Sequence, residues 1–218
     1  MSEMGRHLGA EACGTFALVL GSLCLAAAPN AATPLLAGLL LGVLVAYVGA
    51  GQATFNPALA GALVASGHGK ARGLPVAIGA QVAGALAALA LGALLGIGAA
   101  PSSASSAAVA FAVEALASGL VALVYLVATD LQLAAGPRGL VTGAAAALAS
   151  LFAQPLSGAI LNPLRGLPML LSRDPGASLV AVAGPVAGTT IGLAVALAVR
   201  EATVQRVTRY LKQEAMAS

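Results

Sequence analysis

The sequence has no tryptophan, few other aromatic residues and very few charges. Aromatic side chains make up 3% and charged side chains 8% of the 218 residues, whereas an ordinary soluble domain carries about 25% charged residues. The net charge of +3 comes without a basic face interleaved with aromatic residues, which argues against nucleic-acid binding. Hydrophobic residues make up 60% of the chain. The composition therefore predicts a multi-pass protein that resides in a lipid bilayer.

Cysteine, histidine and acidic residues are also scarce. The two cysteines, Cys13 and Cys24, lie in one apolar segment about three helical turns apart, too far along a helix to form a disulfide. The chain has no Ser–His–Asp, Cys–His or phosphate-loop arrangement that would point to catalysis. We therefore expect no enzymatic activity, no catalytic residues, no metal site and no cofactor.

The length suits six membrane-spanning helices of about 20 residues and leaves no room for a soluble domain. We expect residues 1–218 to form a single transmembrane domain that ends in a tail at 200–218. The ends of the apolar runs place the six spans at about 8–28, 34–50, 74–98, 108–128, 140–153 and 179–199.

Two Asn-Pro steps stand out between the spans, and each opens an apolar run too short to cross a bilayer. Asparagine is a good helix N-cap, and proline is tolerated at the first helical position because its missing N–H has no partner there. Each step therefore predicts the start of a short helix. The two steps comprise Asn56, Pro57 and Ala58 in the first half and Asn162, Pro163 and Leu164 in the second.

Matching landmarks indicate that the two halves are copies. Glu11 and Glu114 are 103 residues apart, and Asn56 and Asn162 are 106 apart. Each half contains three spans, an odd number, so the second copy must cross the membrane in the opposite sense. The sequence therefore predicts an inverted repeat, with repeat 1 at about 8–99 and repeat 2 at about 108–199.

In an inverted repeat, the two short helices enter from opposite faces and bring Asn56 and Asn162 together near the midplane. Broken helices at that depth occur only where they are buried in protein or line an aqueous path. Amide donors and positive helix ends favour neutral molecules over cations. Arg165 follows one turn after Asn162, and we expect it to act as a donor at a pore mouth. This pattern predicts a protein that lets solutes pass selectively and breaks no bond.

Glu11 and Glu114 are the only acidic residues within the predicted spans. One hypothesis makes them proton-relay groups. The other makes each an acceptor for exposed backbone N–H groups of an Asn-Pro loop. The symmetric duplication favours loop support.

Positive charges predict the orientation of the chain. The connections at 29–33 and 99–107 carry none, whereas the other connections and the tail do, so both termini are expected in the cytoplasm. Arg165 and Arg173 are exceptions on the outer side. The compact length and short loops suggest a bacterial inner membrane. The cytoplasmic charges are Lys70, Arg72, Arg138, Arg200, Arg206, Arg209 and Lys212.

Taken together, these features resemble the aquaporin, or major intrinsic protein, family over essentially the whole chain. The resemblance implies an all-α membrane protein with six tilted spans and two re-entrant half-helices. It also implies a homotetramer with a pore through each subunit and passive flow of water or small uncharged solutes. The residues that carry it are Glu11, Thr15, Phe16, Asn56, Pro57, Ala58, Gln81, Gly84, Glu114, Asp130, Asn162, Pro163, Leu164, Arg165, Gly184, Pro185 and Gly188.

The chain departs from the family pattern at the positions that would form its selectivity filter. Leu164 stands where the family usually has alanine, close to the expected meeting point of the half-helices. The resemblance places the filter at Arg165, Ser150, Ala159 and a residue of the second span. That residue is Leu36 by direct count, or Gly38 if the following loop is two residues short. Such a filter is wider than one built with phenylalanine and histidine.

These signals favour a passive water channel that excludes ions and protons. The small filter residues favour an alternative, a facilitator of small neutral solutes such as glycerol, urea, ammonia or peroxide. Gly166 argues against glycerol, because glycerol-conducting relatives usually have aspartate there. A secondary transporter also uses inverted repeats and broken helices. A closed structural protein, with its pore blocked by Leu164, is a further alternative.

Overall fold

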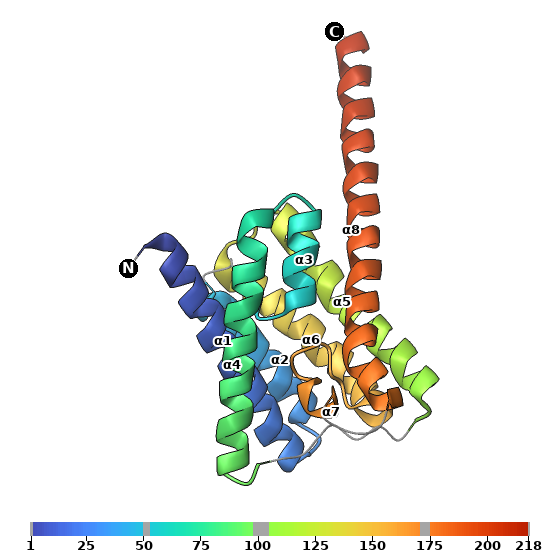
Figure 1. Cartoon of the computed structure of the whole chain (residues 1–218). Coiled ribbons are helices and arrows are strands. Elements are labelled where there is room, and N and C mark those ends of the chain that lie inside the picture. Colours follow the sequence, from blue (N-terminus) through green and yellow to red (C-terminus); the bar gives the residue numbers. More distant parts are fainter. Residues whose placement is uncertain (1, 50–52, 98–104, 171–174, 218) are drawn as a thin grey trace.

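The computed structural model describes residues 2–49, 53–97, 105–170 and 175–217, and these residues form helices joined by short loops, with no strand among them (Figure 1). In chain order the helices are α1 (Glu3–Ala27), α2 (Thr33–Val43), the π-helix η1 (Leu44–Val48), α3 (Pro57–Ala65), the 3-10 turn η2 (Ala71–Gly73), α4 (Leu74–Leu94), α5 (Ala107–Asp130), α6 (Ala135–Ser157), α7 (Leu167–Leu170) and α8 (Pro175–Ala217).

Within the described ranges, five helices are long and apolar enough to cross a membrane: α1, α4 with η2, α5, α6 and α8. A sixth apolar segment, Thr33–Val48, is shorter and combines α2 with η1. These six segments confirm the all-α membrane architecture that the sequence predicts. The expected second span extended to residue 50, but residues 50–52 lie outside the described residues.

The long helices pack in pairs that repeat between the two halves. Helix α1 packs against α4 in the first half, α5 packs against α8 in the second, and α2 packs against α6 across the halves. Glycines permit these approaches: a Cβ on Gly84 would collide with the Ala12 carbonyl oxygen, and one on Gly188 with the Ala115 carbonyl oxygen. Close backbone contact at small residues is the usual basis of helix association in lipid.

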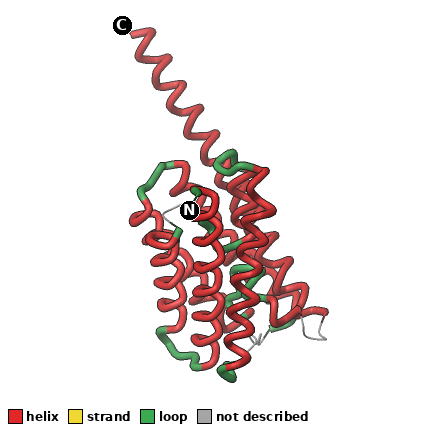
Figure 2. Tube along the Cα trace, turned by 60° about the vertical axis from the view of Figure 1, so that its left-hand side comes forward, coloured by secondary structure: helices red, strands yellow, loops and turns green. Residues whose placement is uncertain are grey.

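Both ends of the chain lie at the same end of the bundle. Figures 1 and 2 show the start of α1 and the end of α8 on the side where α3 turns back into α4. An even number of crossings requires this arrangement. The short helix α3 extends only part of the way through the bundle, with its first residue directed to the interior.

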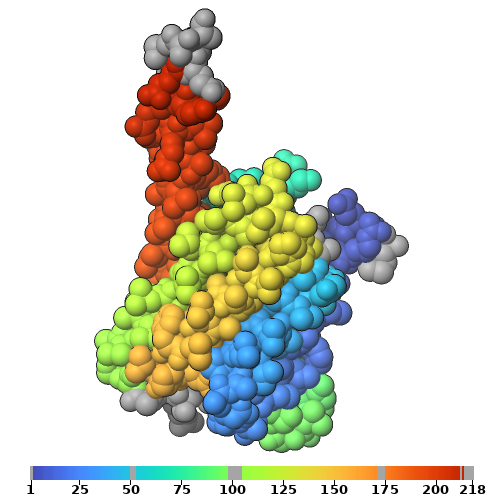
Figure 3. Space-filling view, turned by 180° about the vertical axis from the view of Figure 1, so that it is seen from behind, coloured from blue at the N-terminus to red at the C-terminus, as the bar shows by residue number. Residues whose placement is uncertain are grey.

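The tail expected at 200–218 continues the sixth span as helix through Ala217. Helix α8 is one continuous helix of 43 residues, about 65 Å long at 1.5 Å per residue. Its last part extends beyond the bundle (Figures 1 and 3) and exposes Val204, Val207 and Leu211. No proline or glycine interrupts residues 193–217, so nothing in the sequence ends the helix at the membrane surface.

An ionic cluster ties α8 to the first half of the chain at the point where it leaves the bundle. The Arg200 Nε donates to the Asp130 carboxylate at 3.2 Å, and its Nη1 donates to the Ser66 carbonyl oxygen at 3.0 Å. The His68 Nε2 lies 2.6 Å from the same carboxylate. The cluster therefore connects the end of α3, the end of α5 and α8.

Candidate functional site

The first Asn-Pro loop starts a helix as the sequence predicts. The Asn56 Oδ1 accepts from the backbone N–H groups of Ala58 at 3.0 Å and Leu59 at 3.3 Å, and Pro57 occupies the first position of α3. Asn56 itself has extended backbone angles (φ −149°, ψ 115°), as an N-cap requires. The first loop is thus built by local capping chemistry.

The second Asn-Pro loop differs from the prediction of a helix from Asn162 to about Leu171. The Asn162 Oδ1 does accept from the Leu164 N–H at 3.0 Å. The following backbone, however, forms three-residue turns, with Arg165 N donating to the Asn162 carbonyl oxygen at 3.0 Å. A regular α-helix, α7, begins only at Leu167. The tighter turns bring Gly166 against Ala181 of α8, where a Cβ would collide.

The two asparagine side chains tie the loops to each other. The Asn56 Nδ2 donates to the Leu161 carbonyl oxygen at 3.2 Å, and the Asn162 Nδ2 donates to the Phe55 carbonyl oxygen at 2.7 Å. Phe55 and Leu161 both have positive φ, 53° and 55°, which is rare for bulky residues. This conformation directs each carbonyl toward the opposite asparagine. The two halves therefore meet at a reciprocal pair of hydrogen bonds.

Glu11 of α1 lies behind the first loop. Its two carboxylate oxygens accept from the backbone N–H groups of Thr54 at 3.0 Å and Phe55 at 2.9 Å. The Gln81 Nε2 of α4 donates to the same carboxylate at 2.9 Å. Glu11 is 1% exposed, so these donors replace the water that the charge would otherwise need.

Glu114 of α5 occupies the matching place behind the second loop. It accepts from the backbone N–H groups of Ile160 at 2.7 Å and Leu161 at 2.8 Å, and from the Ser157 hydroxyl. Its side chain is fully buried. Each carboxylate thus binds the N–H groups of the two residues directly before an asparagine. The second residue of each pair is the one with positive φ.

A narrow cavity of about 40 Å³ runs between the two loops. We call it the central cavity. A water molecule needs about 10–15 Å³ of such volume, so the central cavity has room for a few waters. It is lined by Leu18, Ala37, Leu41, Val45, Thr54, Asn56, Leu59, Val121, Tyr125, Thr142, Ala146, Ser150, Leu161, Asn162 and Arg165.

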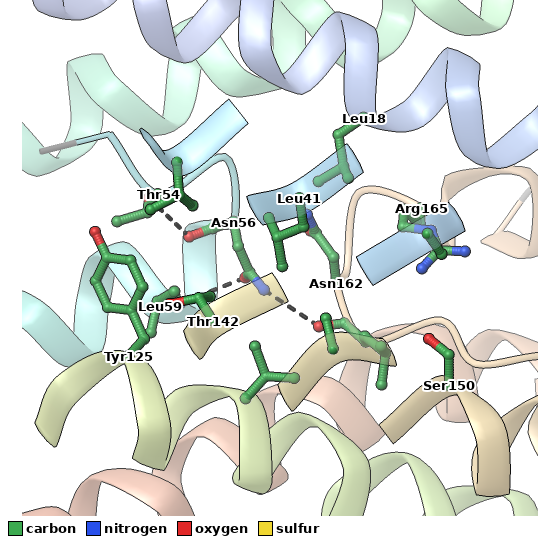
Figure 4. Close-up of a pocket in the computed structure, with 15 residues that line it drawn as sticks. Leu18, Leu41, Thr54, Asn56, Leu59, Tyr125, Thr142, Ser150, Asn162 and Arg165 are labelled. Atoms are coloured by element: carbon green, nitrogen blue, oxygen red, sulfur yellow. Dashed lines mark hydrogen bonds between the residues drawn. The ribbon is translucent and has the colours of Figure 1, made fainter. Parts of the chain in front are cut away.

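Polar side chains follow one another along the central cavity (Figure 4). Arg165 and Ser150 lie at one end, the two asparagines lie between, and Tyr125 lies toward the other end. Leucine and valine side chains supply the apolar lining, including Leu41 and Val45 from α2 and η1. The cavity therefore offers polar and apolar contacts to anything within it.

The structure brings only part of the predicted filter to the central cavity. Ser150 and Arg165 line it, and the Arg165 Nε has no hydrogen-bond partner among the described residues. Ala159 is instead 4% exposed and packs with Ala153 and Leu161. Leu164 is also buried, but against Val19 and its neighbours on α1 and α4, so it does not line the cavity.

Neither residue expected from the second span, Leu36 or Gly38, lines the central cavity. Leu36 is 42% exposed on the outer surface. Gly38 faces α6, where a Cβ would collide with the Gly143 carbonyl oxygen. Ala37, between them, lines the central cavity. A π turn, η1, lies between this residue and Asn56, with the Gly49 N–H bonded five residues back to Leu44, so a count along the sequence does not fix which face of α2 meets the cavity.

Sequence reasoning did not single out Tyr125 and Thr142, which line the cavity on the far side of the asparagines from Arg165. The spacing of Thr142, Ala146 and Ser150 at intervals of four residues on one helix is the signal that points to Thr142. In the part of the chain that the structure describes, no group of three or more His, Cys, Asp or Glu side chains is arranged to hold a metal ion.

Comparisons with known proteins agree with this arrangement. Aquaporin NIP1-3 of Oryza sativa subsp. japonica is 37% identical over 215 residues, covering 87% of this chain and 72% of that protein. Aquaporin NIP1-2 of the same organism is 35% identical over 156 residues, covering 64% and 50% of the two chains. No family model matches the chain.

A solved structure has the same fold. The X-ray structure of the aquaglyceroporin from Plasmodium falciparum superposes with a TM-score of 0.70 at 21% identity, over 88% of this chain and 94% of that one. With the paired loops and the sequence identity to the rice proteins, this places the chain among membrane channels that pass water or small neutral solutes. The chain belongs to the aquaporin family.

Proposed function

We propose that the chain conducts water passively through the central cavity and that small neutral solutes also pass. The observation that carries this proposal is a cavity between the two loops, lined by Asn56, Asn162 and Arg165 together. A membrane protein has little other reason to keep polar side chains around a narrow path at this depth.

Selection against cations follows from the groups that line this path. The Asn56 and Asn162 Oδ1 atoms are already occupied by backbone N–H groups, so the amides face the cavity as donors. Arg165 adds a positive charge at one end, and no acidic side chain is among the described residues that line the cavity. A cation would find donors and a like charge in place of its hydration shell.

Small side chains beside Arg165 support a path wide enough for neutral solutes. Ser150 lies at the Arg165 end of the central cavity, Ala37 also lines the cavity, and neither is bulky or aromatic. Glycerol and urea are the solutes to test, with ammonia and peroxide as smaller members of the same class. The competing proposal is a channel that passes water and excludes glycerol. Gly166 favours it, because glycerol-conducting relatives usually have aspartate at that position.

We propose a supporting role for Glu11 and Glu114. Each binds two backbone N–H groups of a loop that contains a residue with positive φ, a conformation that needs external support. Neither carboxylate lines the central cavity. These contacts support loop stabilisation over a proton relay.

The assembly and orientation are proposals as well. The basic residues support termini in the cytoplasm, and the short loops support a bacterial inner membrane. A homotetramer is supported by an apolar groove of about 350 Å³ between α2 and α6, which lie side by side on the face shown in Figure 3. The molecular mass of the protein in detergent, corrected for bound detergent, tests the tetramer.

Stopped-flow light scattering on proteoliposomes tests the proposed function. Osmotic shrinkage is expected to exceed that of empty liposomes, and glycerol re-swelling is expected to be measurable above the same background. Imposed proton or sodium gradients should not change either rate, because a passive channel is not coupled to them. Rates equal to empty liposomes for every solute would contradict an open channel, and gradient-driven accumulation would favour a secondary transporter.

A further inference from the structure

Helix α6 presents two hydroxyl groups to the central cavity, one on each side of the asparagine pair. Thr142, Ala146 and Ser150 recur at intervals of four residues, so they share one face of the helix. The two hydroxyl-bearing residues are about 12 Å apart along the helix axis. Thr142 is 1% exposed and Ser150 is 2% exposed. Ser150 lies at the predicted filter beside Arg165, whereas Thr142 lies toward Tyr125 (Figure 4).

The Thr142 hydroxyl is one of four buried helix hydroxyls without a hydrogen-bond partner in the described residues, and of these only Thr142 and Ser150 line the central cavity. Six other helix hydroxyls donate to the carbonyl oxygen four residues earlier, at 2.6 to 3.0 Å. They belong to Ser22, Thr129, Ser157, Thr190, Thr203 and Thr208. A buried hydroxyl without a partner is unfavourable unless something in the cavity bonds to it.

The neighbouring polar groups in this part of the cavity are already engaged. The Thr54 hydroxyl donates to the Asn56 carbonyl oxygen at 3.2 Å and accepts from Gln81 at 3.0 Å. The Tyr125 hydroxyl donates to the Ala53 carbonyl oxygen at 3.5 Å. Thr142 is therefore the unpartnered side-chain hydroxyl between the asparagines and Tyr125.

Thr142 also supplies chemistry that the asparagines and Arg165 do not. Arginine has donors only, and the asparagine oxygens accept from their own loops. A hydroxyl both donates and accepts. A solute that carries its own O–H needs an acceptor for that proton, and Thr142 offers one beside the apolar side chains of Leu41 and Val45.

We propose that Thr142 determines specificity by binding a hydroxyl group of the permeating solute after it has passed the asparagine pair. The class it favours is small neutral polyols, in which a short hydrocarbon frame contacts the apolar lining while a hydroxyl bonds to Thr142. This inference rests on the proposed channel function. It adds a second polar contact to the one that Ser150 and Arg165 form at the other end.

The test replaces Thr142 with valine, which has the same shape and lacks the hydroxyl. Glycerol uptake by proteoliposomes is expected to fall about three- to tenfold, the effect of losing one hydrogen bond, while osmotic water flow changes by less than about twofold. Thr142→Ser restores the hydroxyl and should keep glycerol uptake near the wild-type rate. Thr15→Val is the matched control, because Thr15 is also buried and unpartnered but does not line the cavity.

The outcomes separate this inference from the proposed function. Wild-type flux of neither water nor glycerol would overturn both. Water flow without glycerol uptake in the wild type would overturn the polyol assignment alone, as would equal glycerol uptake in Thr142→Val and the wild type. If Thr142→Val does not fold, the comparison of Thr142→Ala with Thr142→Ser, at equal reconstituted protein, decides the same question by their ratio of glycerol to water permeability.

Discussion

Replacing Glu114 with leucine is expected to remove most of the folded protein. The Ile160 and Leu161 N–H groups would lose their acceptor in a buried place, whereas the Ser157 hydroxyl keeps a second acceptor, the Ala153 carbonyl oxygen at 3.0 Å. Each buried, unsatisfied N–H costs about 1–3 kcal/mol. A loss of about 2–6 kcal/mol is a large part of the 5–15 kcal/mol that stabilises a typical domain, by an order-of-magnitude comparison. The monodisperse fraction after detergent extraction measures the effect.

Two further variants make this result specific to the loop. Glu114→Gln keeps one acceptor oxygen and the shape of the side chain, so its folded yield should fall less than that of the leucine variant. Glu201→Leu makes the same change at an exposed position of α8 and should leave the yield unchanged. A Glu114→Leu protein that is as stable as the wild type would contradict the supporting role. A stable Glu114→Gln protein whose flux responds to pH differently from that of the wild type would point to proton handling.

Removing the charge of Arg165 is expected to open the channel to cations. Two positive unit charges about 4 Å apart repel by about 4 kcal/mol at an effective dielectric constant of about 20, which corresponds to about a thousandfold difference in occupancy. Arg165→Ala should therefore raise the permeability to potassium ions by about two to three orders of magnitude. Water flow should persist, because the asparagine pair remains. Conductance across planar bilayers, with water flow measured in parallel, checks both points.

Arg165→Lys is the control for this experiment. It keeps the positive charge while changing the shape of the donor, so cation exclusion should be retained. Cation exclusion by Arg165→Ala equal to that of the wild type would refute the proposed role of the charge. Loss of exclusion in both variants would instead assign the role to the geometry of the guanidinium.

The sequence predicted the parts of the site that depend on local chemistry. An asparagine followed by a proline is a strong helix-start signal, and Asn56 does cap α3. The matching places of Glu11 and Glu114 in the two halves led to the expectation of loop support, and both carboxylates accept from loop N–H groups in the structure. Their effect on stability stays a prediction.

The sequence could not predict features that depend on backbone irregularities. Ala37 faces the central cavity beyond a π turn at Leu44–Val48, and no residue type marks such a turn in the sequence. The second loop has the same Asn-Pro start as the first but continues in three-residue turns and packs Gly166 against α8, a contact between residues distant in the sequence. The sequence also could not predict contacts between side chains that meet only in the folded protein, such as the ion pair of Arg200 and Asp130.

Conduction of water through the central cavity is tested by the osmotic water permeability of Ala146→Leu beside the wild type. Ala146 lines the central cavity between Thr142 and Ser150, and a leucine there adds three carbon atoms to a space of about 40 Å³. Ala87→Leu, on an exposed face of α4, is the control. Proteoliposomes with Ala146→Leu are expected to shrink at the rate of empty liposomes, while those with the wild type and Ala87→Leu shrink rapidly. Rapid shrinkage with folded Ala146→Leu protein would show that water takes another path and would refute conduction through the central cavity.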